Sequence, residues 1–279
     1  ALNQAKIKPD ISMETGNTKS NKIYFTHRSL SNAEIYFLDN HKDEPEENLF
    51  SFSASGKQAQ LWNSVTGKRF SIPVSNHNGN SLTIPLHMAA RESFFVVITD
   101  IYEDLPPIVW TESDKDTTLL NDNWNVFFDP GLGGPGEVVF DTLHDWTKNN
   151  EAGIKYYSGT AVYKRNFYAE QSDKRTFIDL GNPHFVAKVF VNSNEAGIVW
   201  CSPWQLEISD YLKEGENTLE IHVANSLINR MVYDATLPEE QRITYSYPQI
   251  MKPGDDLMAS GLKEVKIIRF LEQQTLGEQ

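Results

Sequence analysis

Residues 153–167, GIKYYSGTAVYKRNF, bring together four aromatic rings, three basic side chains and a Ser-Gly-Thr step, with no acidic residue. A glycine inside an extended segment usually marks a bulge or a close approach of the backbone, so Gly159 is expected to interrupt a strand. Successive strand residues point to opposite faces, which groups four side chains of this stretch: Ala161, Tyr163, Arg165 and Phe167. We therefore interpret the stretch as a buried strand with a bulge. The alternative is that Tyr156, Tyr157 and Ser158 form a surface that faces another domain.

Short apolar segments of the same kind extend in both directions along the chain. Residues 80–88 (NSLTIPLHM) and 186–193 (VAKVFVNS) alternate apolar with other side chains, and Gly, Asn and Pro turn signals separate the segments. Such regular spacing predicts antiparallel sandwiches. The polar residues 102–125, which include two prolines, are predicted to connect two domains. The predicted fold class is therefore all-β, with two β-sandwich domains at residues 1–107 and 108–279.

The composition limits the classes of partner. The 279-residue chain has a formal net charge of −13 and a pI of about 5.0, which argues against nucleic-acid binding, because that requires a basic surface. Its one cysteine, Cys201, excludes an internal disulfide. No apolar run approaches the roughly 18 residues of a membrane span. The chain begins without Met and without a signal-peptide pattern, so we interpret it as a trimmed or mature form. Residues 271–279 are predicted to be a frayed tail.

An ordered series of motifs runs from residue 180 to residue 230. Its members are Leu180-Gly181, Ala187 to Asn192, Gly197 with Trp200 and Pro203, Gly215 with Asn217, Val223 with Asn225, and Asn229-Arg230. The series resembles the galactose-binding-like jelly roll that is attached to many glycoside hydrolases. By this resemblance, the second domain is such a jelly roll.

The rest of the chain resembles neighbouring parts of the same enzymes. Residues 145–167, DWTKNNEAGIKYYSGTAVYKRNF, resemble the segment that leads into this jelly roll in the family-106 α-L-rhamnosidases and their relatives. Four segments of the first half resemble the sandwich that precedes it: FTHRSLSNAEIYFLDN, GKQAQLWNSVTGK, an Ile-Pro-Leu strand and SFFVVI. The resemblance covers most of the chain in the expected order. It departs from the family at Leu227, where many members carry Trp, and at residues 232–234, where they carry Ile-Gly-Asp.

In those rhamnosidases the catalytic carboxylates belong to a (β/α)-barrel upstream of these modules. The resemblance therefore implies the non-catalytic C-terminal region of a rhamnosidase-like glycoside hydrolase, exported to the periplasm or surface of a bacterium that degrades plant polysaccharide. Residues 1–107 would be an accessory sandwich, immunoglobulin-like or barrel-capping. The implied partners are the upstream barrel of the same polypeptide and, weakly, carbohydrate. Two alternatives stay open: a free-standing carbohydrate-binding module, and a structural or adhesive surface protein.

Six residues are candidates for contacting a saccharide. Sugars stack on flat aromatic rings and hydrogen-bond to short polar groups and arginine. The candidates are Trp146, Trp200, Trp204, Asn229, Arg230 and Asp234. Each has a structural alternative, because tryptophan in a small sandwich belongs mostly to the core, and the three polar residues could instead pin the loop of residues 225–242 to the sheet.

No catalytic residue is predicted within the chain. Glycoside hydrolysis needs two carboxylates about 5 to 10 Å apart, and the neighbouring acids Glu137, Asp141 and Asp145 carry no signature of such a pair. Scattered histidines and a single thiol do not predict a zinc site, and no cofactor is expected to be required. Calcium is left open, since residues 129–137 and Asp255-Asp256 offer oxygen ligands.

Overall fold

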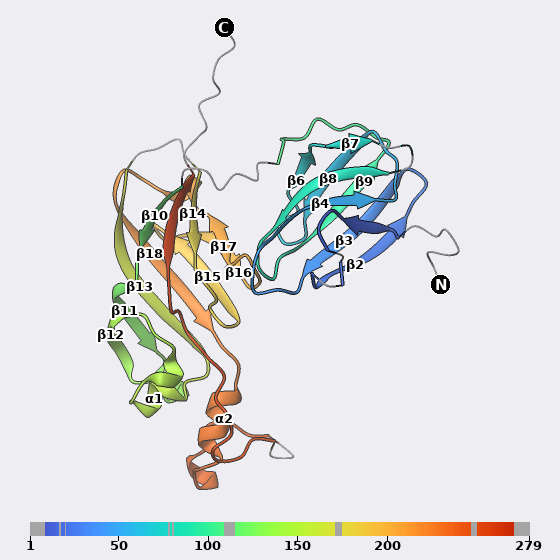
Figure 1. Ribbon diagram of the computed structural model, residues 1–279. Coiled ribbons are helices and arrows are strands. Elements are labelled where there is room, and N and C mark those ends of the chain that lie inside the picture. The colour runs from blue at the N-terminus through green and yellow to red at the C-terminus, as the bar shows by residue number, and fades with distance from the viewer. Residues whose placement is uncertain are drawn as a thin grey trace. The chain divides into compact units, whose positions relative to one another are not determined.

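The computed structural model describes residues 9–16, 18–19, 21–77, 79, 81–108, 115–170, 175–246 and 250–270. The chain divides into two compact units, Ala1–Glu112 and Ser113–Gln279 (Figure 1). The sequence-based boundary after residue 107 lies shortly before this division, and the predicted tail at 271–279 lies outside the described residues. Strands dominate both units and pair in antiparallel ladders, which confirms the all-β prediction.

The first unit is a sandwich of two sheets. The five-stranded sheet has the order β2-β3-β9-β5-β6 and the four-stranded sheet the order β1-β4-β8-β7. Apolar side chains at alternate positions, such as Leu82, Ile84 and Leu86 of β8, are buried in the core between them. The bounds are β1 Ile11–Met13, β2 Ile23–Ser29, β3 Ala33–Asn40, β4 Glu46–Phe52, β5 Gln58–Asn63, β6 Arg69–Ile72, β7 Asn76–His77, β8 Leu82–Met88 and β9 Ser93–Thr99.

Tyr36 of β3 carries an unsatisfied hydroxyl in this core. Its ring stacks on His27 with centroids 4.1 Å apart and meets the edge of Phe52 at 4.8 Å. The hydroxyl oxygen is buried, and it has no hydrogen-bond partner among the described residues. Burial raises the pKa of Tyr36, so the phenol stays neutral. A buried polar group without a partner costs about 1–3 kcal/mol, which makes this hydroxyl a weak point of the unit.

Tyr36→Phe is therefore expected to leave the first unit equally stable or to stabilise it by about 1 kcal/mol, because the ring contacts stay and the unsatisfied hydroxyl goes. Urea unfolding curves of the two proteins measure the difference. The matched control is Tyr163→Phe in the second unit, where the hydroxyl accepts hydrogen bonds from Trp146 Nε1 and Leu262 N, so the same change should destabilise. A clear loss of stability in Tyr36→Phe would show that its hydroxyl has a partner in solution.

The second unit is also a two-sheet sandwich. Its six-stranded sheet has the order β12-β11-β13-β18-β15-β16 and its four-stranded sheet the order β10-β19-β14-β17, with one apolar core cluster between them. The strands are β10 Lys115–Leu119, β11 Asp122–Phe128, β12 Gly136–Thr142, β13 Thr160–Ala169, β14 Thr176–Asp179, β15 Val186–Val191, β16 Asn194–Val199, β17 Gln205–Glu207, β18 Gly215–Ala224 and β19 Lys266–Phe270. The helices are η1 Pro130–Leu132, η2 Trp146–Lys148, α1 Ala152–Lys155, η3 Ser209–Tyr211, α2 Ile228–Asp234 and η4 Glu239–Gln241.

The stretch at 153–167 supplies β13, a central strand of the larger sheet. Its alternation is as predicted, because Ala161, Tyr163 and Phe167 are buried on one face. The prediction that Gly159 interrupts the strand is wrong: β13 begins at the next residue, Thr160. Gly159 lies in the left-handed region at φ +153°, and a Cβ there would come within 2.6 Å of a Leu132 methyl. The glycine therefore allows a close approach of two loops in front of the strand.

The predicted connection at residues 102–125 is wrong in its second half. Residues Lys115–Leu119 form β10, which pairs with β19 at the edge of the four-stranded sheet. An edge strand whose side chains stay exposed needs no apolar face, so its polar composition resembles that of a loop. Among the described residues, no helix has the length and apolar character that crossing a membrane requires.

The connection between β18 and β19 extends from one end of the sandwich of the second unit. Ala224, the last residue of β18, pairs with Thr160 and with Val186, so β13 and β15 begin at this same end. Residues 225–265, which we call the excursion, carry α2 and η4. Figure 1 shows α2 lying beyond the ends of the strands of this unit. The excursion contains three of the six candidate residues.

Candidate functional site

The three polar candidates Asn229, Arg230 and Asp234 all lie on α2 and are all buried. Arg230 Nε and Nη2 lie 2.9 and 2.8 Å from Asp234 Oδ1, an ion pair between residues four apart on the helix. The backbone N–H of Arg230 donates to the buried Ser158 Oγ at 3.1 Å. The buried Ser158 side chain thus contacts the backbone of α2. This contact argues against the alternative that residues 156–158 form a surface facing another domain.

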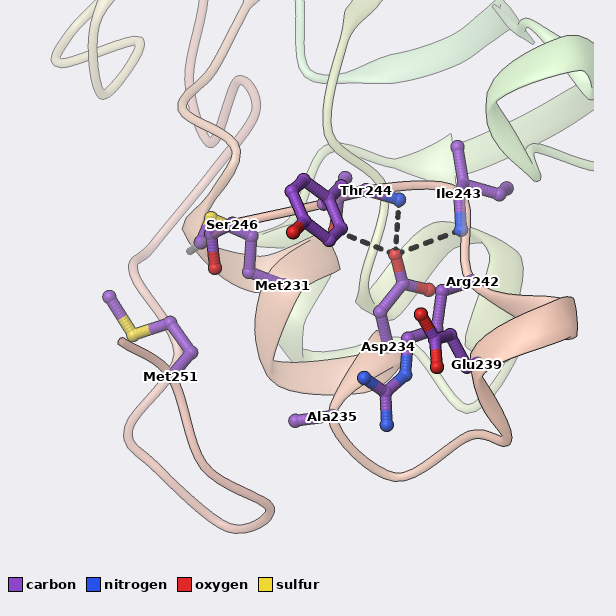
Figure 2. A pocket seen from close by; sticks show the side chains of 10 residues that line it. Met231, Asp234, Ala235, Glu239, Arg242, Ile243, Thr244, Ser246 and Met251 are labelled. Atoms are coloured by element: carbon purple, nitrogen blue, oxygen red, sulfur yellow. Dashed lines mark hydrogen bonds between the residues drawn. The ribbon is translucent and has the colours of Figure 1, made fainter. Parts of the chain in front are cut away.

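The other carboxylate oxygen of Asp234 binds the segment that follows η4. Oδ2 accepts hydrogen bonds from Ile243 N at 3.1 Å, Thr244 N at 2.6 Å and Thr244 Oγ1 at 2.7 Å (Figure 2). Burial acts to raise the pKa of Asp234, but the hydrogen bonds from Thr244 and the Arg230 guanidinium outweigh it and hold the pKa below its usual range. Asp234 is therefore an anion at neutral pH whose two oxygens are both occupied.

Asn229 binds a later segment of the excursion, residues 258–260. Its amide nitrogen donates to Met258 O at 2.8 Å and to Ser260 Oγ at 3.2 Å, and its amide oxygen accepts from Met258 N at 2.8 Å. Trp146 N donates to Ser260 O at 3.0 Å. The sequence-based candidates Trp146 and Asn229 thus meet at one segment of chain, which both of them fix in place.

Trp146 is corrected from a candidate sugar platform to a core residue. Its side chain is fully buried, its ring meets Phe128 and Tyr157 edge-on at 5.2 and 5.8 Å, and its Nε1 donates to the Tyr163 hydroxyl. Gly261, at φ +85°, packs so closely on the indole that a Cβ there would overlap it. The ring has no face left for a ligand.

The two other tryptophans lie apart from α2 in sequence and environment. Trp200 follows β16 and is 57 % exposed, whereas Trp204 is partly buried against the core of the second unit. Trp204 N donates to Cys201 O at 3.1 Å, closing the turn between them. Of the three rings, only Trp200 is available for stacking.

A pocket of about 240 Å³ opens on the solvent side of α2 (Figure 2). Asp234 forms part of its wall, and Glu239, Arg242 and Ser246 add polar groups. Tyr245 adds an aromatic ring that is 83 % exposed. The remaining lining residues are Met231, Ala235, Ile243, Thr244 and Met251. This combination of one ring with several short polar groups is suited to a small polar ligand.

Of the residues that line this pocket, sequence reasoning selected Asp234 alone. It treated residues 225–242 as a loop and named no candidate among Glu239, Arg242, Tyr245 and Ser246. The available signal was Tyr245 beside Ser246 and Arg242, an aromatic ring among polar groups in a segment without strand alternation.

Three of the acids named for catalysis or metal binding, Asp129, Asp145 and Asp255, hold local turns or loops. Asp145 Oδ1 accepts hydrogen bonds from Thr147 N and Ser260 N at 3.0 and 3.2 Å. These bonds lower the pKa of Asp145 against the effect of burial. Asp129 Oδ1 accepts from Gly131 N at 2.8 Å and Asp255 Oδ2 from Lys252 N at 2.8 Å, as in ordinary turns. The described residues contain no group of three or more His, Cys, Asp or Glu side chains suited to a metal ion.

Comparison with known proteins relates the chain to glycoside hydrolases. Residues 1–75 match the family model described as alpha-L-rhamnosidase, that of glycoside hydrolase family 106. The solved rhamnosidase of Novosphingobium sp. PP1Y is 30 % identical and superposes with a TM-score of 0.81 over 96 % of the chain. The predicted resemblance to a rhamnosidase-like glycoside hydrolase region is confirmed.

A curated protein of Formosa agariphila, named "Putative beta-glucuronidase", is 36 % identical over 124 residues, which is 43 % of the chain. A second protein of that name from the same organism is 23 % identical over 176 residues. The chain spans 26 % of the Novosphingobium rhamnosidase and 11 % and 16 % of the two Formosa proteins. Its relatives are therefore much larger proteins than the chain itself.

Proposed function

We propose that the chain is a non-catalytic accessory region of a rhamnosidase-like glycoside hydrolase that acts on plant polysaccharide. In this proposal the excursion braces the catalytic barrel, and the pocket beside Asp234 lines one side of the substrate cleft. The hydrolase is exported to the periplasm or the cell surface. The region requires no cofactor, and its own affinity for saccharide is weak, in the millimolar range expected of a shallow site.

The observation that carries the proposal is the double use of Asp234. One oxygen binds Arg230 and the other holds residues 243 and 244, so α2 and the segment that follows η4 are tied together beyond the sandwich. Exposed apolar side chains lie along it: Leu227, Ile243, Tyr245, Ile250 and Met258. Exposed apolar groups of this kind suit a contact with another part of a large enzyme.

The state of the Asp234 carboxylate supports a non-catalytic role for this pocket. A glycosidase needs one carboxylic acid that keeps its proton near neutral pH, which requires a raised pKa. Asp234, the pocket acid at the centre of the network, has a lowered pKa and no free oxygen. It therefore cannot serve as a proton donor without dismantling the excursion.

Titration of the chain with L-rhamnose, D-galactose and pectic oligosaccharides tests the proposal. We expect saturable NMR shifts at Thr244, Tyr245 and Ser246 with millimolar affinity, unchanged by EDTA or added calcium. Tyr245→Ala should weaken binding about fivefold, since a stacked ring contributes about 1 kcal/mol. Glu240→Ala, next to the pocket-lining Glu239, is the matched control and should change nothing.

Two results contradict the proposal. Release of p-nitrophenol from an α-L-rhamnoside or a β-D-glucuronide, abolished by Glu239→Gln, would make the chain itself catalytic. Absence of any shift at tens of millimolar saccharide would remove the substrate-cleft role and leave the region as scaffold.

A further inference from the structure

The outward face of the six-stranded sheet carries a second hollow, separate from the excursion. Strand register aligns Asn125 of β11 with Lys164 of β13, Lys164 with Glu220 of β18, and Glu220 with Phe190 of β15. The neighbouring positions Trp124, Val126, Tyr163, Val189, Val191, Leu219 and Ile221 are buried, so these four side chains point outward. At a spacing of about 4.8 Å between strands, the row is about 14 Å long.

A groove of about 420 Å³ follows this row. A second row with Asn166 opposite Thr218 forms its other side. Its lining is mainly amide, hydroxyl and paired charges: Asn123, Asn125, Lys164, Arg165, Asn166, Ser193, Thr218 and Glu220, with Phe190 and Leu219. The groove is larger than the pocket beside Asp234, and the backbone at Asn125, Lys164, Thr218 and Glu220 is held in antiparallel ladders.

The charges of the groove are already balanced. Lys164 Nζ lies 2.8 Å from Glu220 Oε2, and Arg165 Nη1 lies 3.3 Å from Asp122 Oδ1. An anionic ligand would have to compete with these carboxylates for Lys164 and Arg165. A neutral hydroxyl group can instead donate a hydrogen bond to the carboxylates and accept one from the basic groups. The amides of Asn125 and Asn166 each offer both a donor and an acceptor, which matches the paired hydroxyls of a sugar ring. The ring of Phe190 packs beside His222 at 5.0 Å and beside the Lys188 ammonium at 5.3 Å, and the rest of it supplies an apolar surface for the C–H groups of the sugar.

We propose that this groove binds a segment of a neutral oligosaccharide chain lying across β11, β13, β18 and β15 (Figure 1). The ligand class rests on the proposed role in polysaccharide degradation, but the site shares no residue with the excursion. Asn125 and Asn166 hydrogen-bond the hydroxyls, Phe190 contacts one ring face, and the Lys164–Glu220 pair presents a donor and an acceptor at the centre.

The test is an NMR titration of the full chain with xylohexaose, cellohexaose and a galacturonan hexasaccharide. We expect one of the neutral hexasaccharides to shift the amide signals of Asn125, Lys164 and Thr218 in a saturable manner. The double variant Asn125→Ala with Asn166→Ala should weaken that binding about tenfold, and Phe190→Leu, which keeps an apolar side chain but removes the ring, about threefold. Asn150→Ala, an exposed asparagine outside the groove, is the matched control and should leave the affinity unchanged.

Three outcomes overturn the groove as a neutral-sugar site. They are the absence of shifts with both neutral hexasaccharides at tens of millimolar, tighter binding of the galacturonan hexasaccharide, and binding that the groove variants do not affect. Tyr245→Ala separates the two sites: it should weaken binding at the excursion pocket and leave the groove unchanged. A protein that binds in the groove but not at the pocket supports this inference while the proposed function fails.

Discussion

Asp234→Asn is expected to lower the free energy of unfolding of the second unit by about 3–5 kcal/mol. The substitution leaves the Arg230 guanidinium buried without a counter-charge, and removing one partner of a buried ion pair has this cost. Gly133 packs so closely on Arg230 that the side chain has little room to turn towards solvent. Urea unfolding followed by tryptophan fluorescence measures the loss, since four of the six tryptophans lie in this unit.

Lys188→Ala is the matched control, because Lys188 and Glu195 form an ion pair of the same unit with both side chains exposed. Exposed pairs contribute between zero and about 1 kcal/mol, so this variant should unfold close to the parent protein. Equal unfolding midpoints of the two variants would contradict the assignment of Asp234 as the anchor of the excursion.

The lowered pKa of Asp234 also predicts how the stability of the second unit depends on pH. The pKa of Asp234 is lower in the folded protein than the value of about 3.9 for an unfolded chain. Its stabilisation is therefore fully present above about pH 4 and is lost as the pH falls through the lower, folded value. The parent protein should lose more stability than Asp234→Asn over that acidic range, and the two unfolding curves should approach each other.

Trp146→Ala is expected to destabilise the second unit by about 3–5 kcal/mol, the usual range for deleting a buried aromatic side chain. The change removes the edge contacts with Phe128 and Tyr157 and the donor to Tyr163. It also removes the surface on which Gly261 packs, so the excursion loses its support. Thermal unfolding and hydrogen exchange of residues 258–262 measure both effects.

Trp200→Ala is the matched substitution at an exposed ring and should change stability by about 0.5 kcal/mol or less. If Trp146→Ala were as stable as this control yet lost saccharide binding, Trp146 would be a ligand contact after all, against the packing described here.

The strand content and the inward faces follow from the sequence. Alternation at 161, 163 and 167 places these side chains in the core without reference to any distant residue, because the period of two is a local property of the extended backbone. The spacing of Arg230 and Asp234 likewise permits an ion pair on one helix turn. The exposed edge strand β10 was missed because its polar side chains give no such alternation.

The candidate site was decided by contacts between segments that are far apart in the chain. Ser158 lies 72 residues before Arg230, and Ser260 lies 31 residues after Asn229. The hydrogen bonds between these residues nevertheless determine which polar groups already have partners within the protein. Tryptophan is the same residue type at 146 and at 200, but the first ring is enclosed by Phe128, Tyr157 and Gly261, and the second follows β16 and is exposed. Burial is a property of the packed neighbours and not of the residue itself. For that physical reason the sequence alone determined the sandwiches and their faces, while the tertiary structure decided which residues remain free to bind.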